Sequence, residues 1–135
     1  MQLKKTKANE LIKLNEKYDF LNIPKLYAFS QNEWIKEHSK VLDNILKKFK
    51  NCKVAIRSSS IVEDQPYVSK AGAFKSYLNI KLKKQELKKY INLVIKSYGK
   101  HSFKKNQIFI QEMVEKIVLS GVVTNRDLET GAPYY

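Results

Sequence analysis

The chain has 135 residues, 43% of them hydrophobic and 11% aromatic, so it is long and apolar enough to fold around a core. Its formal net charge is +13, yet all but two of its 26 basic residues are lysine, whereas base reading and two-point phosphate contacts favour arginine. These totals make a nucleic-acid partner unlikely and exclude a membrane-spanning run or a signal peptide, and the single Cys52 fits a reducing cytoplasm.

The first third of the chain predicts helix, strand and helix. Residues 8–18 form the first helix, and residues 24–29 form a short strand that begins at a proline. Ser30 and Glu33 then have the spacing of a capping box, which opens a helix reaching residue 50. The apolar residues of this helix recur at spacings of three and four, and His38 falls among them as a packed side chain: Trp34, Ile35, Val41, Leu42, Ile45, Leu46 and Phe49.

The rest of the chain alternates between strands and one further helix. Residues 53–58 predict a strand led by Cys52, which we interpret as an inert thiol, and 59–75 form a polar loop. Residues 76–82 predict another strand, and 84–98 predict a helix with an apolar stripe that ends at Gly99. Two more strands are predicted over residues 107–114 and 118–124. The order of elements is typical of a mixed α/β domain.

Several kinds of chemistry are excluded by what the sequence lacks. Four scattered glycines cannot form a Walker A loop or a dinucleotide fingerprint. Two distant histidines and one cysteine supply no zinc spacing, and no serine stands in a nucleophile-elbow context. Neither a metal site nor a nucleophilic triad is therefore predicted within this chain.

The most distinctive stretch is "VAIRSSSIVED", in which Arg57 ends an apolar strand and three serines follow. The planar guanidinium of an arginine fixed at this place can bind two oxygens of one phosphate, which a lysine cannot do. The serine hydroxyls and backbone N–H groups of the turn would add donors around the same anion. A structural ion pair between Arg57 and Glu63 or Asp64 explains the same residues equally well.

Three ordered segments resemble the ATP-binding domain of the phosphoenolpyruvate synthase and pyruvate, phosphate dikinase family. The segment "VAIRSSSIVEDQPYVSKAGAFKSYLNI" is similar to the family's Arg-Ser-Ser signature. The segment "IFIQEMVEKIVLSGVVTNRDLETG" is similar to its Gln-x-Met-Val strand and its Thr-Arg-Asp loop, and "KTKANELIKL" to its first helix. The resemblance covers nearly the whole chain and implies that residues 1–135 are the N-terminal portion of an ATP-grasp-type domain, with a mixed sheet and flanking helices.

The resemblance also implies which residues bind ATP. Lys7 and Arg57 match the family's phosphate-binding lysine and arginine, and Gly72 and Ser76 match small or hydroxyl residues near the phosphates. The adenine-lining hinge strand of the family is matched, mainly for its backbone groups, by Gln111, Glu112, Met113 and Val114. The family's Gly-Gly before the first lysine is Lys5-Thr6 here, which departs from its pattern.

Membership would imply a kinase that uses ATP and Mg²⁺ to phosphorylate a carrier histidine, releases AMP, and passes the phosphate to an acceptor such as pyruvate or glutamine. The acidic magnesium ligands, the phosphohistidine domain and the acceptor domain are expected outside this chain, so the 135 residues alone should be inactive. The alternative is a basic, non-enzymatic module that binds nucleic acid or another polyanion. An ATP module requires Lys7, Arg57 and Gln111 in one cleft, whereas a polyanion module requires lysines gathered on one face.

Overall fold

The computed structural model describes residues 6–60, 75–99, 106–127 and 129–133, and Gly72, Glu63, Asp64 and His101 lie outside them. In chain order the elements are α1 (Lys7–Lys17), β1 (Leu26–Ser30), α2 (Gln31–Lys48), β2 (Val54–Ser59), β3 (Ser76–Ile80), α3 (Lys84–Ser97) and β4 (Gln107–Glu112).

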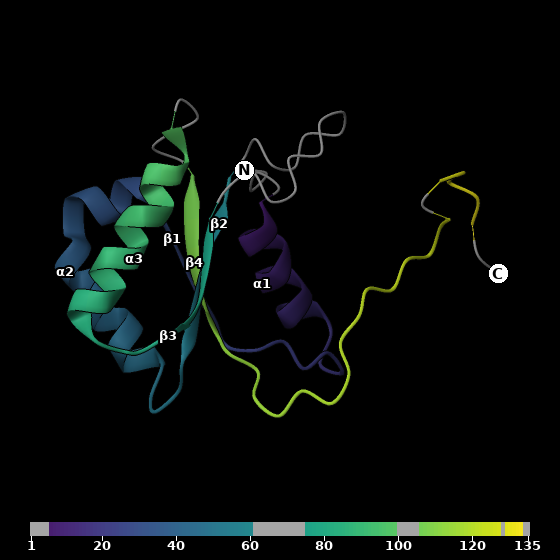
Figure 1. Cartoon of the computed structure of the whole chain (residues 1–135), viewed down its shortest axis with the longest axis horizontal. Helices are drawn as coiled ribbons and strands as arrows, with labels where there is room; N and C mark the ends of the chain where they lie inside the picture. The colour runs from purple at the N-terminus through teal and green to yellow at the C-terminus, as the bar shows by residue number, and fades with distance from the viewer. Residues whose placement is uncertain (1–5, 61–74, 100–105, 128, 134–135) are drawn as a thin grey trace.

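The four strands form one sheet in the order β1-β4-β2-β3, and each of these pairings is antiparallel. Helices α2 and α3 cover one face of the sheet, and α1 covers the other (Figure 1). The α/β class with flanking helices is confirmed, and the helices and these four strands agree with the sequence-based predictions to within a few residues at their ends. The expected mixed sheet is corrected, because the four described strands pair only in the antiparallel sense.

Helix α2 begins as the sequence predicts. The Glu33 carboxylate accepts a hydrogen bond from the Ser30 backbone N–H at 2.7 Å, and the Ser30 hydroxyl accepts one from the Glu33 N–H at 3.1 Å. This capping box satisfies donors that the first helical turn leaves without a partner. The helix is kinked at Glu37, where φ is −137° and ψ is 40°.

That kink helps to explain one wrong prediction, the placement of Ile35 on the apolar face. The Ile35 side chain is 62% exposed, whereas Trp34, Val41 and Ile45 are buried. The backbone at Glu37 is not helical, so the helical period is interrupted between Ile35 and the apolar residues that follow. Ile35 therefore does not share the buried face of those residues.

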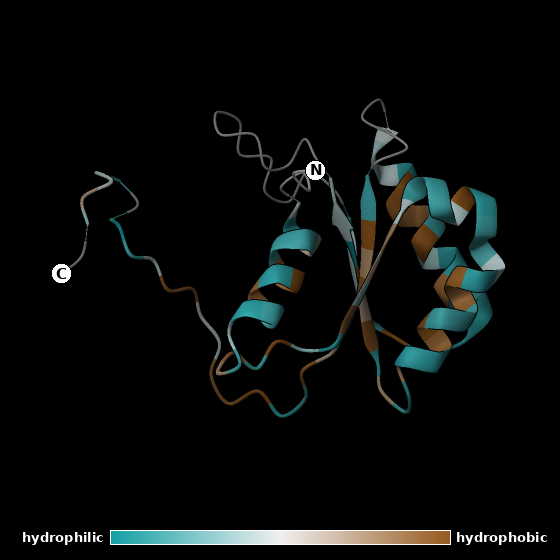
Figure 2. Cartoon of the chain, turned by 180° about the vertical axis from the view of Figure 1, so that it is seen from behind, coloured by the Kyte–Doolittle hydropathy of each residue, from teal (hydrophilic) through white to brown (hydrophobic). Residues whose placement is uncertain are grey.

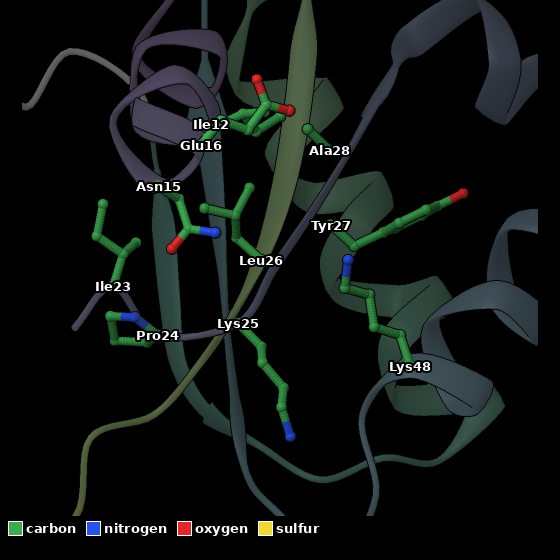
Figure 3. A pocket seen from close by; sticks show the side chains of 10 residues that line it. All are labelled: Ile12, Asn15, Glu16, Ile23, Pro24, Lys25, Leu26, Tyr27, Ala28 and Lys48. Carbon is green, nitrogen blue, oxygen red and sulfur yellow. The ribbon is translucent and has the colours of Figure 1, made fainter. Parts of the chain in front are cut away.

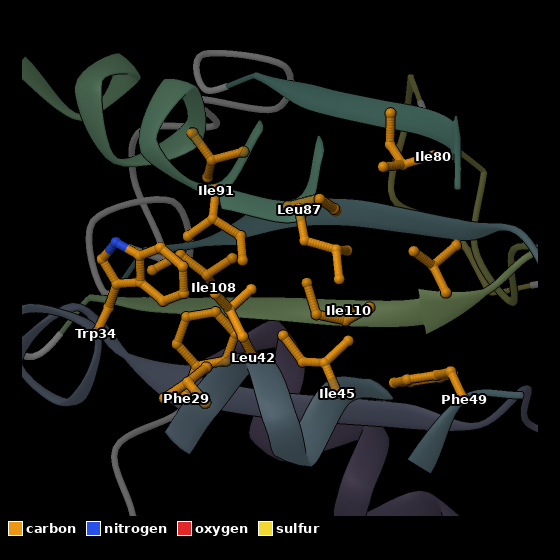
Figure 4. Packing of buried hydrophobic residues seen from close by; sticks show 14 of the residues in the cluster. Phe29, Trp34, Leu42, Ile45, Phe49, Ile80, Leu87, Ile91, Ile108 and Ile110 are labelled. Atoms are coloured by element: carbon orange, nitrogen blue, oxygen red, sulfur yellow. The ribbon is translucent and has the colours of Figure 1, made fainter. Parts of the chain in front are cut away.

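The main core lies between the sheet and the α2–α3 layer (Figure 4). Ile45, Leu87 and Ile91 of the helices are fully buried against strand residues such as Ile56 and Ile110. Figure 2 shows the hydrophobic side of α2 and α3 turned towards the sheet and the hydrophilic side turned outward. These two amphipathic helices therefore hold the sheet from one side.

The contact between the rings of His38 and Trp34 in α2 confirms the interpretation of His38 as a packed side chain. His38 is half-buried, and its ring centroid lies 5.8 Å from that of Trp34. The indole Nε1 of Trp34 donates a hydrogen bond to Asn92 Oδ1 of α3 at 2.9 Å, which satisfies its one polar atom. Both residues belong to the α2–α3 layer.

The strand predicted over residues 118–124 is wrong. Val118, Leu119, Val122 and Val123 are each at least 90% exposed, and within the described ranges this segment pairs with no strand. In Figure 1 it runs away from the sheet after β4. A run of β-branched residues gives strand propensity, but a strand also requires a neighbour for its backbone hydrogen bonds.

None of the helices in the described part of the chain is long and apolar enough to cross a membrane.

Cys52 precedes β2 and is half-buried. Burial raises the pKa of its thiol, and the nearby Glu112 carboxylate raises it further, because both disfavour the thiolate. Alkylation by iodoacetamide should therefore reach half its maximal rate above about pH 8.5, the ordinary pKa of a cysteine. The same protein unfolded in urea is the control, and a half-maximal rate at lower pH in the folded protein would contradict an inert thiol.

Candidate functional site

The side of the sheet that faces α1 carries most of the predicted site. Cα partners in adjacent strands point their side chains to the same face, and successive residues of one strand point to opposite faces. Arg57 is the Cα partner of Ser76 in β3 and of Phe109 in β4. Since Ile56, Ile108 and Ile110 belong to the α2–α3 core, Arg57, Ser76 and Phe109 face the α1 side.

The start of α1 is fixed to this face by hydrogen bonds. Thr6 is the N-cap, and its hydroxyl accepts a hydrogen bond from the Asn9 N–H at 3.3 Å. The same hydroxyl donates to Gln107 Oε1 of β4 at 2.5 Å, and the Ala8 N–H donates to the Ser59 hydroxyl of β2 at 3.0 Å. Lys7, the first helical residue, is exposed between these anchored neighbours.

Arg57 is half-buried, and its Nε–H is completely buried. No hydrogen-bond acceptor for this Nε, and no ion pair to the Arg57 side chain, is found among the described residues. A buried donor without a partner is costly, and it is satisfied when an acceptor such as a phosphate oxygen binds. Because Glu63 and Asp64 lie outside the described residues, the ion-pair alternative stays open.

The three serines after Arg57 are buried and serve the fold. The Ser59 N–H donates to the Tyr98 hydroxyl at 3.3 Å, and Ser60 Oγ donates to Asn106 Oδ1 at 3.2 Å. Ser58, Ser59 and Ser60 are at most 5% exposed. The hydroxyls of Ser59 and Ser60 therefore bond within the fold, and the burial of all three serines does not fit the open anion site that the sequence predicts for them.

The predicted hinge strand ends β4. Gln111 is half-buried on the α1 side, where its Cα partners are Leu26 and Ala55. The N–H groups of Glu112 and Met113 donate to the carbonyl oxygens of Lys25 at 2.9 Å and of Lys53 at 3.0 Å. These two amides are thus occupied, so an adenine ring would have to meet other groups of this segment.

Val114, the last predicted hinge residue, is 55% exposed beyond the end of β4. Ser76 is exposed beside Arg57 at the start of β3, and Gly72 lies outside the described residues. The structure thus brings Arg57 and Ser76 together, places Lys7 next to Ala8, whose N–H binds Ser59, and places Gln111 on the same side of the sheet. The sequence alone did not predict that Thr6, Gln107 and Tyr98 support this site. Of the three, only Thr6 could have been identified from the local sequence, because threonine is a good N-cap residue before a helix.

Comparison with known families gives one match that spans almost the whole chain. The family model for the AMP/ATP-binding domain of pyruvate phosphate dikinase matches residues 2–134. The chain belongs to this family. No curated protein and no solved structure was found to match it. The resemblance inferred from the sequence motifs is therefore confirmed, and the chain carries a dikinase-type ATP-binding domain.

A cavity of about 420 Å³ in this dikinase-type domain lies away from Arg57 (Figure 3). It opens between the C-terminal half of α1 and strand β1, with apolar walls that include Ile12, Ile23 and Leu26. Lys25 and Lys48 also line it. Because Leu26 is the Cα partner of Gln111, the cavity adjoins the hinge end of the predicted site and not its phosphate end.

Metal ligands were not found in the described parts of the dikinase-type domain. No three histidine, cysteine, aspartate or glutamate side chains gather there in a way that could hold an ion. Magnesium in nucleotide sites is held by one or two carboxylates together with substrate phosphates. Within the described residues a carboxylate pair for magnesium is therefore not identified, and the ligands implied by the resemblance are expected outside this chain.

Proposed function

We propose that the protein is a phosphotransferase that phosphorylates a carrier histidine from ATP, releases AMP, and passes that phosphate to a small acceptor such as pyruvate or glutamine, while the second phosphate removed from ATP leaves as inorganic phosphate. The family match supports the ATP-binding half of this proposal. The observation that carries the choice of site is the buried Nε–H of Arg57, which has no acceptor in the described residues and faces the α1 side of the sheet.

In this proposal Arg57 binds phosphate oxygens with its planar guanidinium, whose position is fixed by the central strand β2. Lys7, which is exposed in the first turn of α1, contributes a second positive charge, and Ser76 contributes a hydroxyl beside Arg57. The segment from Gln111 to Val114 would line the adenine through the Gln111 side chain and through backbone groups other than the Glu112 and Met113 N–H, which already bind the carbonyl oxygens of Lys25 and Lys53.

The carrier histidine is proposed to belong to another domain. His38 packs against Trp34 in the α2–α3 layer, across the sheet from Arg57, where it cannot meet phosphates held by Arg57. We likewise propose that Mg²⁺, its carboxylate ligands and the acceptor site come from outside the described residues. Residues 1–135 would then be the N-terminal portion of the ATP-binding domain, working in the cytoplasm.

The released nucleotide tests this function. The protein that carries this domain together with its other domains should convert ATP to AMP when pyruvate or glutamine is supplied in turn as acceptor. A dikinase cleaves between the α- and β-phosphates, whereas a simple kinase leaves ADP. The 135-residue chain alone should release no AMP, since the carrier histidine is lacking. Release of ADP as the sole nucleotide product would contradict the proposal.

A second candidate, a polyanion-binding module, is favoured by one observation. Exposed lysines gather at the end of the sheet where β2 begins and β3 and β4 end: Lys25, Lys47, Lys48, Lys50, Lys53, Lys81, Lys83 and Lys84. Of these, Lys84 is paired with Asp43 at 2.7 Å. If this end defined the function, duplex DNA would bind in a strongly salt-dependent manner and Arg57 would not contribute to nucleotide binding.

A further inference from the structure

The side chain of Gln107 bridges the two residues that flank the turn containing Lys7. Its Oε1 accepts the hydrogen bond from the Thr6 hydroxyl at 2.5 Å, and its Nε2 donates to Asn9 Oδ1 at 3.2 Å. Both polar atoms of one amide are thereby used on a single helical turn. Thr6 is 2% exposed, so its contact is shielded from competing water.

The anchor behind Gln107 is itself rigid. Gln107 begins β4, which lies between β1 and β2, and its Cα partners are Ser30 and Ser59. The backbone carbonyl oxygen of Gln107 accepts a hydrogen bond from the Tyr98 hydroxyl at 2.5 Å, and Tyr98 is 1% exposed. The sheet and the end of α3 therefore fix the backbone of Gln107, from which its side-chain amide reaches Thr6 and Asn9.

Ser59 supplies a second fixation from β2, because its hydroxyl accepts the Ala8 N–H at 3.0 Å. Three of the residues nearest Lys7 are thus tied to strands, while the Lys7 side chain itself stays exposed. Ser59 lies two residues after Arg57 on the same face of β2, so the fixed turn stands next to Arg57.

We propose that Gln107 is a positioning residue: it holds the first turn of α1 in place, so that Lys7 and Arg57 can bind the same phosphate group. This inference rests on the proposed function. A lysine side chain has four rotatable bonds, and its contribution to binding grows when its backbone is already held in the productive place. Gln107 would act only through Lys7, without touching ATP.

Replacing Gln107 with methionine keeps the length of the side chain and removes both hydrogen bonds. We expect the affinity for ATP, measured by equilibrium titration of the protein that carries this domain, to fall about three- to tenfold. Hydrogen exchange of the Ala8 and Asn9 amides should become faster, because the turn is released. The control Asn92→Ala removes the acceptor of Trp34 Nε1 in the opposite layer and should leave ATP affinity unchanged, even where it lowers the melting temperature.

Two further variants separate positioning from general stability. Unlike Gln107→Met, Gln107→Glu should retain most of the ATP affinity of the native protein. Its carboxylate can still accept a hydrogen bond from the Thr6 hydroxyl, and the Asn9 amide can turn to donate to it. In a Lys7→Met background, Gln107→Met should cause no additional loss of ATP affinity, since the residue it positions is gone.

The inference is overturned if Gln107→Met lowers ATP affinity equally with and without Lys7, or if Lys7→Met alone weakens ATP binding and Gln107→Met does not. Failure of the proposed function gives a different result: neither Lys7→Met nor Arg57→Met changes ATP affinity, although Gln107→Met still accelerates amide exchange in α1. That result would also remove the positioning role, while leaving the structural link intact.

Discussion

Replacing Arg57 with lysine is expected to slow ATP-dependent phosphorylation by about ten- to a hundredfold while leaving the melting temperature nearly unchanged. Lysine keeps the positive charge but loses the planar pair of donors and the buried Nε–H. A charge-assisted hydrogen bond is worth about 1.5–3 kcal/mol, and each ~1.4 kcal/mol of lost transition-state stabilisation is a factor of ten in rate.

The melting temperature and the rate of AMP release should be measured on the same preparation. Arg57→Met, which also removes the charge, should slow phosphorylation more than Arg57→Lys. A structural ion pair with Glu63 or Asp64 gives the opposite balance, namely a lowered melting temperature and nearly normal AMP release per folded molecule. That second pattern would assign Arg57 to the fold and not to the nucleotide.

The largest expected effect on stability comes from Ile45→Ala in α2. The Ile45 side chain is 0% exposed and packs in the core between the helices and the sheet. Truncating a fully buried isoleucine removes apolar contacts and leaves a cavity, which costs about 2–5 kcal/mol of unfolding free energy. We expect the urea midpoint to fall clearly, and the melting temperature to fall by roughly ten degrees.

Ile35→Ala is the matched control, since it is the same substitution in the same helix. Ile35 is 62% exposed, so its truncation should change the unfolding free energy by no more than about 0.5 kcal/mol. The sequence pattern places both isoleucines on the apolar face, and only the structure separates them. Equal losses of stability in the two variants would contradict the difference in burial between Ile35 and Ile45.

The sequence by itself determined the features that depend on neighbouring residues. These features are the capping box of Ser30 and Glu33, the apolar stripe of α3 and the strand that contains Arg57. Each depends on residue spacing and capping chemistry within one short segment. The ordered motifs around Arg57 and Gln111 also identified the family, because they occur in the right order over nearly the whole chain.

Only the tertiary structure decided which side chains serve the fold and which remain for a ligand. The hydrogen bond between Thr6 and Gln107 joins residues 101 positions apart, and that between Ala8 and Ser59 joins residues 51 apart, so no local pattern could reveal them. The same contacts withdraw Ser59 from the predicted anion site. Residues 118–124 have the propensity of a strand but pair with none in the described structure, because propensity is local and backbone pairing needs a partner.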